Sequence, residues 1–195
     1  MRKLIILLLA ILTACSPKAD KKEERVRVNN YSVPEEKKMP QEIEKDLGYA
    51  FTVLYDTSGN RVNNINIACS KVSGSILGPG EEFSFNKIVG KRGLNEGFME
   101  APVLVSGEKE TGIGGGICQV SSTIHMAAVH AGLEISERHS HSKKVSYAPY
   151  GLDAAVVYGE KDFKFINNTT ENIYIYVWMS DNKIFAKIVK KVLTE

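Results

Sequence analysis

The longest regular pattern in the chain runs from Val120 to Leu133, where apolar residues recur every three or four positions. The apolar positions are Val120, Ile124, Ala127, Ala128 and Ala131. This period predicts an amphipathic helix. Most of these side chains are small, so the helix is expected to pack closely against a sheet, and Gly132 is typical of the position at which a helix ends.

On both sides of this helix, short apolar runs separated by turn residues predict strands. The earlier part of the chain predicts strands at Tyr49–Tyr55, Glu82–Asn86 and Ala101–Val105, a helix at Asn63–Val72 and a loop at Gly107–Gly116. The later part predicts strands at Leu133–Ile135, Lys144–Tyr147, Ala154–Tyr158, Phe163–Ile166, Asn172–Met179 and Ile184–Val189, with a hairpin turn at Asp181-Asn182. This order predicts an α+β fold, a single domain in which a central helix opening at Cys118 packs on a largely antiparallel β-sheet.

The N-terminus has the pattern of a secretion signal. Arg2 and Lys3 precede the apolar run Leu4–Leu12, which is too short for an ordinary membrane-spanning helix. The run ends in Leu-Thr-Ala-Cys, which resembles the bacterial lipobox and implies cleavage before Cys15 and lipid attachment to its sulfur. An uncleaved anchor, or an ordinary signal with a chance cysteine, is the alternative. In either case we expect the domain to lie on the extracytoplasmic face of the membrane, anchored there by the lipid if Cys15 is modified.

A highly charged segment follows the signal. It contains three prolines and few large apolar residues, so it cannot bury enough surface to fold alone. We therefore expect a lipoprotein signal peptide at residues 1–14, a lipidated, charged and flexible linker at 15–47, and the folded domain at 48–195.

Composition narrows the possible functions further. The net charge of +2 and the lack of a basic cluster with aromatic residues argue against nucleic-acid binding. Three cysteines cannot form a disulfide framework. Cys69 lies within a predicted helix and is expected to be a small buried apolar residue. Oligomeric state is not indicated by the sequence.

Cys118 has the setting of a reactive thiol. Three glycines, Gly114, Gly115 and Gly116, precede it, and the predicted central helix starts at this point. The positive end of a helix dipole favours thiolate, and glycine lets another chain approach the backbone closely. A packed, inert cysteine is the alternative interpretation.

A cysteine nucleophile needs a base, and usually a group that orients the base. His125 and His130 lie further along the same predicted helix and are expected to be exposed or at its rim. His139 and His141 precede a predicted strand, and either can supply the base, while Asp153 is placed to orient it. A zinc site formed by Cys118, His139 and His141 is the other option, but no closely spaced ligand pair supports it, so we expect no metal and no cofactor.

Several segments together resemble the VanW domain family. The resemblance covers about residues 49–190, and its most specific part is Gly-Gly-Gly-Ile-Cys-Gln at 114–119. The other segments are Arg61–Ile65, Pro79–Asn86, Glu137-Arg138 with His141-Ser142, Gly151–Val156 and Asp162–Asn168. The family takes its name from an accessory gene of vancomycin-resistance clusters, and some members resemble cysteine-dependent L,D-transpeptidases of peptidoglycan.

The resemblance implies a catalytic set for this chain. Cys118 would be the nucleophile, His141 the base and Asp153 its orienter. The N–H groups of Cys118 and Gln119 would bind the oxyanion, and Gly114–Gly116 would let a peptidoglycan stem peptide lie against the backbone. Arg61 or Arg138 would bind a stem carboxylate or form a structural ion pair. The alternatives are a non-catalytic, lipid-anchored module that binds stem peptides or a wall-synthesis partner, and a peptidase that cleaves a different bond.

Overall fold

The computed structural model of the chain describes residues 41–105 and 108–194. The predicted signal peptide, Cys15 and most of the predicted linker lie outside the described residues. In the part of the chain that the structure describes, no helix combines the length and apolar character needed to cross a membrane.

Three antiparallel sheets and a few helices form the domain. The largest sheet has the strand order β1-β9-β8-β2, the second has the order β3-β7-β6, and β4 and β5 form a hairpin. The strands are β1 (Glu42–Val53), β2 (Ser75–Leu77), β3 (Glu82–Ser84), β4 (Glu100–Val105), β5 (Glu108–Ile113), β6 (Glu134–Glu137), β7 (Lys164–Ile166), β8 (Ile173–Ser180) and β9 (Lys183–Leu193). The helices are α1 (Gly59–Val72), α2 (Phe85–Val89), the 3-10 turn Leu94–Glu96 and α3 (Ile117–His130). The predicted α+β fold is confirmed.

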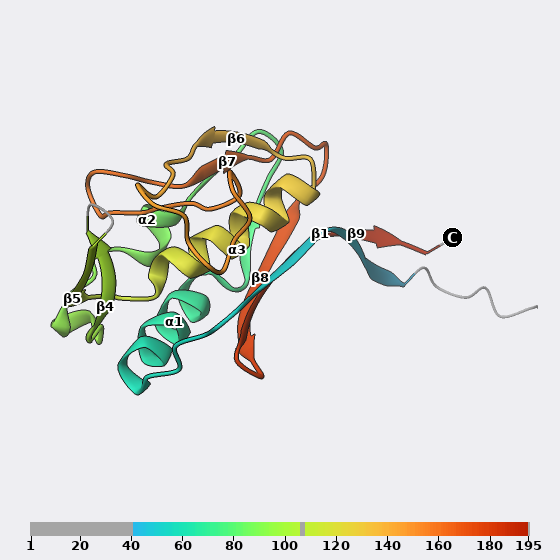
Figure 1. Cartoon of the computed structure of the whole chain (residues 1–195). Helices are drawn as coiled ribbons and strands as arrows, with labels where there is room; N and C mark the ends of the chain where they lie inside the picture. The colour runs from blue at the N-terminus through green and yellow to red at the C-terminus, as the bar shows by residue number, and fades with distance from the viewer. Residues whose placement is uncertain (1–40, 106–107, 195) are drawn as a thin grey trace, which may run out of the picture. The chain divides into compact units, whose positions relative to one another are not determined.

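Helix α3 runs between the largest sheet and the β3-β7-β6 sheet, and the β4–β5 hairpin lies beside its N-terminal end (Figure 1). The buried side chains of α3 join those of α1 and of both sheets in one hydrophobic cluster. The face of β1 that meets α3 carries the small buried residues Gly48, Ala50 and Thr52. Thr52 and Thr123 also share a buried hydrogen bond of 2.8 Å. These contacts hold the start of α3 at a fixed place on the sheet.

Gly48 is the point of closest approach between β1 and α3. A Cβ atom at this position would lie 2.1 Å from the carbonyl oxygen of Ala127 and 2.7 Å from the backbone nitrogen of Ala131. Both are backbone atoms of the helix and cannot turn aside as a side chain can. Close packing of α3 on the sheet therefore requires glycine here.

We expect Gly48→Ala to lower the free energy of unfolding by about 3 kcal/mol, because the added methyl group forces the helix away from the sheet. Gly59→Ala is the matched control, since no atom lies within 4 Å of a Cβ at that position. Urea denaturation of both variants measures the difference. An equal, small effect at both positions would contradict this account of the packing.

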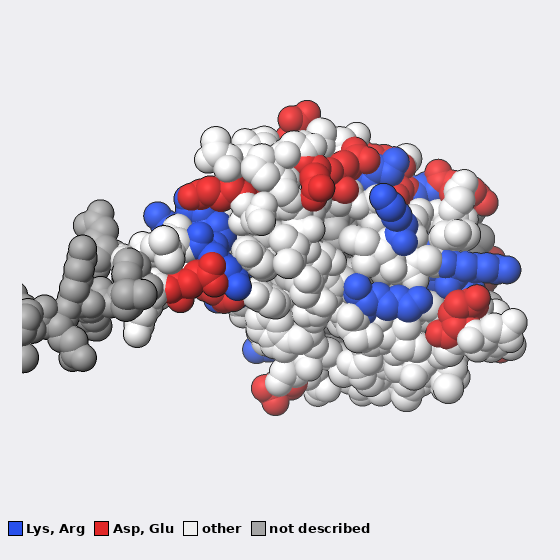
Figure 2. Space-filling view, turned by 180° about the vertical axis from the view of Figure 1, so that it is seen from behind, with Lys and Arg blue, Asp and Glu red and all other residues white. Residues whose placement is uncertain are grey.

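The boundary between the predicted linker and the domain is corrected by the structure. The charge of residues 42–47 predicts a linker, but they form the first half of β1 and pair with the end of β9. Their acidic side chains meet lysines of β9, with Asp46 2.8 Å from Lys187 and Glu42 3.2 Å from Lys191. Opposite charges lie together at the left of Figure 2, where β1 and β9 meet. Cross-strand pairing makes a charged segment compatible with a strand.

Three other sequence expectations fail locally. Residues 108–113 form β5 rather than a loop, and they pair with β4 over its whole length. Residues 144–147 and 154–158 form no strand; the second segment contains only an isolated bridge between Val157 and Lys161.

The predicted turn at Asp181-Asn182 is confirmed, since both residues have the positive φ angles of a tight hairpin turn.

Candidate active site

Cys118 is the second residue of α3 and is partly buried. Gly116 caps the helix with a φ angle of 106°, a conformation that favours glycine. The thiol therefore lies at the positive end of the helix dipole, where thiolate is favoured. The sequence placed the start of the helix within one residue of its observed position.

The glycines before Cys118 let this corner of the chain pack tightly. A Cβ at Gly115 would lie 2.5 Å from the carbonyl oxygen of Pro102, and one at Gly116 would lie 3.0 Å from Ile65. A Cβ at Gly114 would lie 3.3 Å from the side chain of Arg92. Intramolecular packing accounts for all three glycines, and their use as a platform for a peptide stays a prediction.

The segment that precedes and follows Asp153 runs along α3 instead of joining a sheet. Ser121 Oγ donates to the carbonyl of Ala154 at 2.7 Å, and the Ala154 N–H donates to Ser122 Oγ at 2.9 Å. One turn later, His125 Nδ1 lies 2.9 Å from the carbonyl oxygen of Leu152. Helix side chains thus satisfy the backbone groups that a neighbouring strand would otherwise bind, which is why the predicted strand does not form.

Cys118 also contacts the backbone of this segment, as Ser121, Ser122 and His125 do. The N–H of Val156 lies 3.5 Å from Sγ, and Sγ lies 3.6 Å from the Val156 carbonyl oxygen. Alternate residues of this extended segment, Leu152, Ala154 and Val156, therefore face α3. Asp153 falls between two of them and is directed toward the loop that contains His141.

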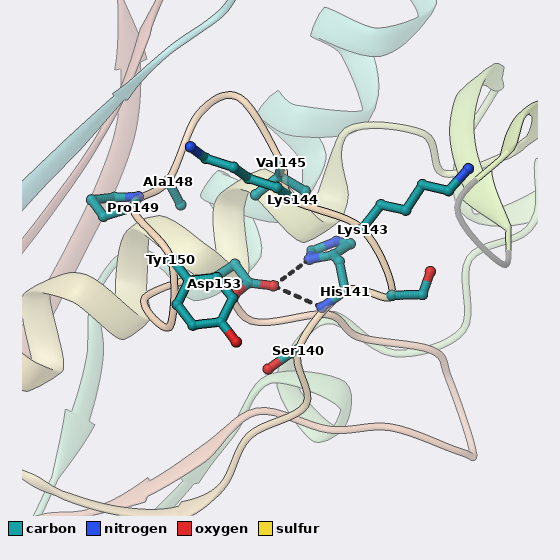
Figure 3. Close-up of a pocket in the computed structure, with 10 residues that line it drawn as sticks. Ser140, His141, Lys143, Lys144, Val145, Ala148, Pro149, Tyr150 and Asp153 are labelled. Carbon is teal, nitrogen blue, oxygen red and sulfur yellow. Dashed lines mark hydrogen bonds and ion pairs between the residues drawn. The ribbon is translucent and has the colours of Figure 1, made fainter.

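Asp153 holds His141 by two hydrogen bonds. Its Oδ2 lies 2.7 Å from His141 Nδ1 and accepts the His141 backbone N–H at 2.7 Å (Figure 3). Arg138 donates to the Asp153 carbonyl at 2.6 Å and lies 3.4 Å from Oδ1. The His141 side chain is 8% exposed. Because Nδ1 is engaged by Asp153, Nε2 is the ring nitrogen left to face Cys118.

Cys118 and His141 perturb each other's ionisation. Burial acts to raise the pKa of the Cys118 thiol, but the hydrogen bonds from His141 and the Val156 N–H and the charges of His141 and Arg92 outweigh it, so the pKa is lowered. Burial acts to lower the pKa of His141, but Cys118 and Asp153 outweigh it, so the pKa is raised. Both shifts favour a thiolate–imidazolium pair.

We expect Cys118 to be alkylated by iodoacetamide at a lower pH than an ordinary thiol. The pKa of His141 is raised by Cys118 and by Asp153, and Asp153→Asn removes the second of these charges. The imidazolium is then less populated, so the pKa of Cys118 rises. The midpoint of the rate–pH curve should therefore move to higher pH in this variant. Mass spectrometry of the Cys118 peptide measures the rate, and Cys69 is an internal control because burial raises its pKa to about 12. An unshifted midpoint would contradict a role for Asp153 in activation.

The other three histidines have different surroundings. His139 Nε2 pairs with Glu137 at 2.9 Å. His130 is exposed, as expected, and its Nδ1 lies 2.7 Å from the Tyr49 carbonyl oxygen. The expectation that His125 is exposed was wrong: it is buried against Phe163 and binds the Leu152 carbonyl. Segment 152–156 packs on this face of α3 and buries the ring, a contact that no local sequence pattern indicates.

Gln119 has a structural place in the fold. Its side chain is 2% exposed, accepts from Arg61 at 2.8 Å and donates to Thr52 and to the Val53 carbonyl. Its N–H donates to the Gly116 carbonyl at 3.0 Å. The expectation that this N–H binds an oxyanion is therefore corrected, because the donor is already used. Among the described residues no acceptor takes the Cys118 N–H, which remains available.

The two arginines named from the sequence also differ. Arg138 is engaged by Asp153 and Ser140, which favours its structural alternative. Arg61 binds Gln119 and also lines a groove beside Cys118. Its Nε is buried with no partner among the described residues. Arg61 is thus the one of the two that is placed to meet a ligand.

The groove beside Cys118 has a volume of about 1220 Å³. It is bounded by the β4–β5 hairpin, the start of α3, the 140–147 loop and residues 155–158. Most of the charged side chains described in its lining are basic, and Lys143 among them pairs with Glu108 at 2.7 Å. The charged lining residues are Asp56, Arg61, Lys91, Arg92, Lys143, Lys144 and Lys161. An extended, anionic chain fits such a surface better than a small neutral molecule does.

Sequence reasoning missed two residues of this site. Tyr147 Oη lies 3.4 Å from His141 Nε2, and burial raises the pKa of its phenol, which keeps it protonated as a donor. Arg92 lies close enough to Cys118 for its charge to act on the thiol. Arg92 lies within the glycine-rich stretch 90–97, far from Cys118 in sequence, so no local pattern linked the two.

No group of His, Cys, Asp and Glu side chains suited to a metal ion occurs within residues 41–105 and 108–194. In the zinc alternative, His139 would be a ligand together with Cys118 and His141. Its ring nitrogen is instead paired with Glu137.

Cys118, His141 and Asp153 have the arrangement of a thiol, a base and an orienting carboxylate, which is suited to nucleophilic attack on an acyl group.

Comparisons with known proteins agree with the resemblance seen in the sequence. A family model described as VanW like protein matches residues 60–189. Bacillus subtilis (strain 168) YoaR is 42% identical over 131 residues, which cover 67% of this chain and 43% of YoaR. The vancomycin B-type resistance protein VanW of Enterococcus faecalis (strain ATCC 700802 / V583) is 29% identical over 143 residues, which cover 71% of this chain and 51% of that protein.

No solved structure gives a significant match to the chain. The chain spans about half the length, or less, of the two curated relatives. The family match nevertheless includes the helix start, His141 and Asp153. With the family model covering two thirds of the sequence, the predicted resemblance is confirmed and the chain belongs to the VanW-like family.

Proposed function

We propose that this chain is an L,D-transpeptidase, a cysteine acyltransferase that forms 3-3 cross-links between peptidoglycan stem peptides. The observation that carries the proposal is the Cys118–His141–Asp153 arrangement, which opens on a groove. A thiol with a lowered pKa, a base with a raised pKa and a carboxylate on the far ring nitrogen are what acyl transfer through a thioester requires.

The first half of the reaction forms the acyl-enzyme. The Cys118 thiolate attacks the carbonyl carbon of the third stem residue, a diamino acid such as diaminopimelate, and a C–S bond forms. The oxyanion is held by the Cys118 N–H, with the Tyr147 hydroxyl as a second donor. The C–N bond to the terminal D-alanine then breaks, and the His141 imidazolium gives its proton to the departing amine.

The second half transfers the acyl group. The side-chain amine of another stem attacks the thioester carbon, gives a proton to neutral His141 and expels the Cys118 thiolate. Asp153 holds the ring in one orientation through both halves. Water in place of the amine yields the tripeptide, which is L,D-carboxypeptidase activity at the same site.

The groove supports a peptidoglycan stem as substrate. Stem peptides are extended and carry carboxylates, and the groove is large, open and lined by basic side chains. Arg61 is placed to bind a stem carboxylate. The Enterococcus relative is named a vancomycin resistance protein, and a function in the cell wall agrees with that name.

We also propose that the domain works on the extracytoplasmic face of the membrane. The basis is the N-terminal sequence: the charged and apolar run of residues 1–14, the lipobox cysteine Cys15 and the charged segment after it. Since β1 begins at Glu42, the tether would comprise about residues 15–41. A lipid on Cys15 would keep the groove near newly made wall.

Incubation of the protein with stem tetrapeptides tests the proposed function. We expect 3-3 cross-linked dimers and free D-alanine, detected by liquid chromatography and mass spectrometry. Tripeptide without dimer would indicate the carboxypeptidase variant of the same chemistry. Saturable binding of the tetrapeptide without any product would contradict catalysis and favour the non-catalytic module, for which the basic groove alone suffices.

A further inference from the structure

Arg92 has a cationic group with no hydrogen-bond partner. Both terminal nitrogens of its guanidinium are buried, and neither has an acceptor among the described residues. Asp162 is the carboxylate whose charge acts on it, but the Asp162 oxygens accept from Ser84 and from the N–H groups of Asn86 and Phe163. An unpaired buried cation is costly to a fold, and an anionic ligand would supply the missing partner.

The side chain is nevertheless held firmly. The guanidinium carbon lies 5.6 Å from the centre of the Phe85 ring and 5.7 Å from that of Tyr158. The aliphatic part lies where a side chain of residue 114 would be, so Gly114 leaves room for it. The two rings and Gly114 thus pack around Arg92, while both of its terminal nitrogens have no hydrogen-bond partner among the described residues. This is the arrangement of a preorganised anion receptor.

Arg92 lines the same groove as Cys118, and its aliphatic part packs beside Gly114, just before the start of the helix that carries Cys118. A ligand group bound by Arg92 would therefore lie in the part of the groove near the thiol. Planar, bidentate pairing with guanidinium is characteristic of carboxylates. In the proposed function, the carboxylate nearest to the scissile carbonyl is the free terminus of the residue that leaves, one residue away.

We propose that Arg92 is the receptor for the free C-terminal carboxylate of the donor peptide. The inference rests on the proposed function and narrows its substrate class to peptides with one residue beyond the attacked carbonyl. Arg92 would thus act as a substrate-binding residue that restricts attack to chain ends. Once the C–N bond breaks, the same contact leaves with the released amino acid.

The carboxylate has a route to this place. Tyr158, whose ring centre lies 5.7 Å from the guanidinium carbon, is 53% exposed and lines the groove. In the proposed complex, outward rotation of this exposed ring would open a path to the guanidinium nitrogens. Its interaction with Arg92 is then replaced by the stronger charge-assisted hydrogen bonds to the ligand.

The test compares one tetrapeptide with a C-terminal acid and the same tetrapeptide with a C-terminal amide. Isothermal titration with a Cys118→Ala protein measures binding without turnover, and kcat/KM is measured with Cys118 present. We expect the acid to be preferred about 10- to 100-fold in both measurements. Arg92→Met should reduce the preference to within about twofold by weakening the acid alone.

Matched variants separate recognition from other roles. Lys87→Met removes an exposed charge from the same helix as Phe85, outside the groove, and should leave the preference unchanged. Arg92→Lys keeps the charge near Cys118 but lacks the planar fork, so it should keep the alkylation midpoint of Cys118 and lose part of the preference. Because Arg92 lacks a partner, Arg92→Met should not lower the thermal midpoint of unfolding.

Two results would overturn this inference and leave the proposed function standing. The first is a protein that consumes both peptides with no preference for the acid, and the second is an Arg92→Met variant in which the binding of both peptides is weakened equally. The second would indicate that Arg92 serves another stem carboxylate or only the thiolate. A protein that neither binds nor consumes either peptide overturns the proposed function and this inference together.

Discussion

Replacing Cys118 with alanine is expected to lower the rate of 3-3 cross-link formation by at least about 10⁴-fold. The thiol forms the bond that carries the acyl group, and no other described nucleophile shares its setting at the start of α3 beside His141. Its partial burial and its modest contacts to Val156 mean that the fold does not depend on it. Cross-link analysis of purified stem peptides, together with the unfolding curve, separates lost chemistry from lost structure.

Cys69→Ala is the control for loss of a thiol. Cys69 is 3% exposed in α1, within the hydrophobic cluster, and its raised pKa keeps it protonated and unreactive. We expect this variant to keep its cross-linking rate. Full activity in the Cys118→Ala protein would exclude the thioester mechanism.

His141→Ala is expected to lower kcat by about 10²- to 10⁴-fold, the usual effect of losing a general acid–base. The wild-type rate should be bell-shaped in pH. The acidic limb reports ionisation of Cys118, and its midpoint should lie below the pKa of an ordinary thiol because the pKa of Cys118 is lowered. The basic limb reports loss of the His141 proton, and its midpoint should lie above the pKa of an ordinary imidazole because the pKa of His141 is raised. The variant should lose the basic limb, and its acidic limb should move to higher pH.

His139→Ala tests the choice between the two neighbouring histidines. His139 is paired with Glu137 and partly exposed, so its removal should leave both limbs in place. The pH profile separates loss of the base from a change in loop structure, because a changed loop would lower the rate at every pH and leave both limbs in place. Loss of the basic limb in His139→Ala, with retention in His141→Ala, would reverse the assignment of the base.

The parts of the fold that local patterns determine were predictable. The helical period gave α3, and the Asp181-Asn182 dipeptide gave the turn between β8 and β9. The failures concern segments whose structure is decided by a distant partner. Residues 42–47 are charged like a tether but pair with lysines of β9, and residues 154–158 look like a strand but bind the side chains of α3.

The candidate site divides in the same way. Cys118, His141 and Asp153 lie together near the start of α3, with His141 on a loop. Gln119 stands next to the nucleophile in sequence, yet its side chain faces β1 and its N–H is already used. Arg92 and Tyr147 could not be found from spacing, because the folding of separate loops brings them to the thiol.

The central claim is that Cys118 carries the acyl group, and trapping that intermediate tests it most directly. The protein is mixed with the tetrapeptide, quenched in acid within the first turnover and analysed by intact and peptide mass spectrometry. The account predicts an adduct on Cys118 with the mass of the stem acyl group without its terminal D-alanine, removable by hydroxylamine. Cross-linked product formed with no adduct on Cys118, or with the acyl group on another residue, would contradict it.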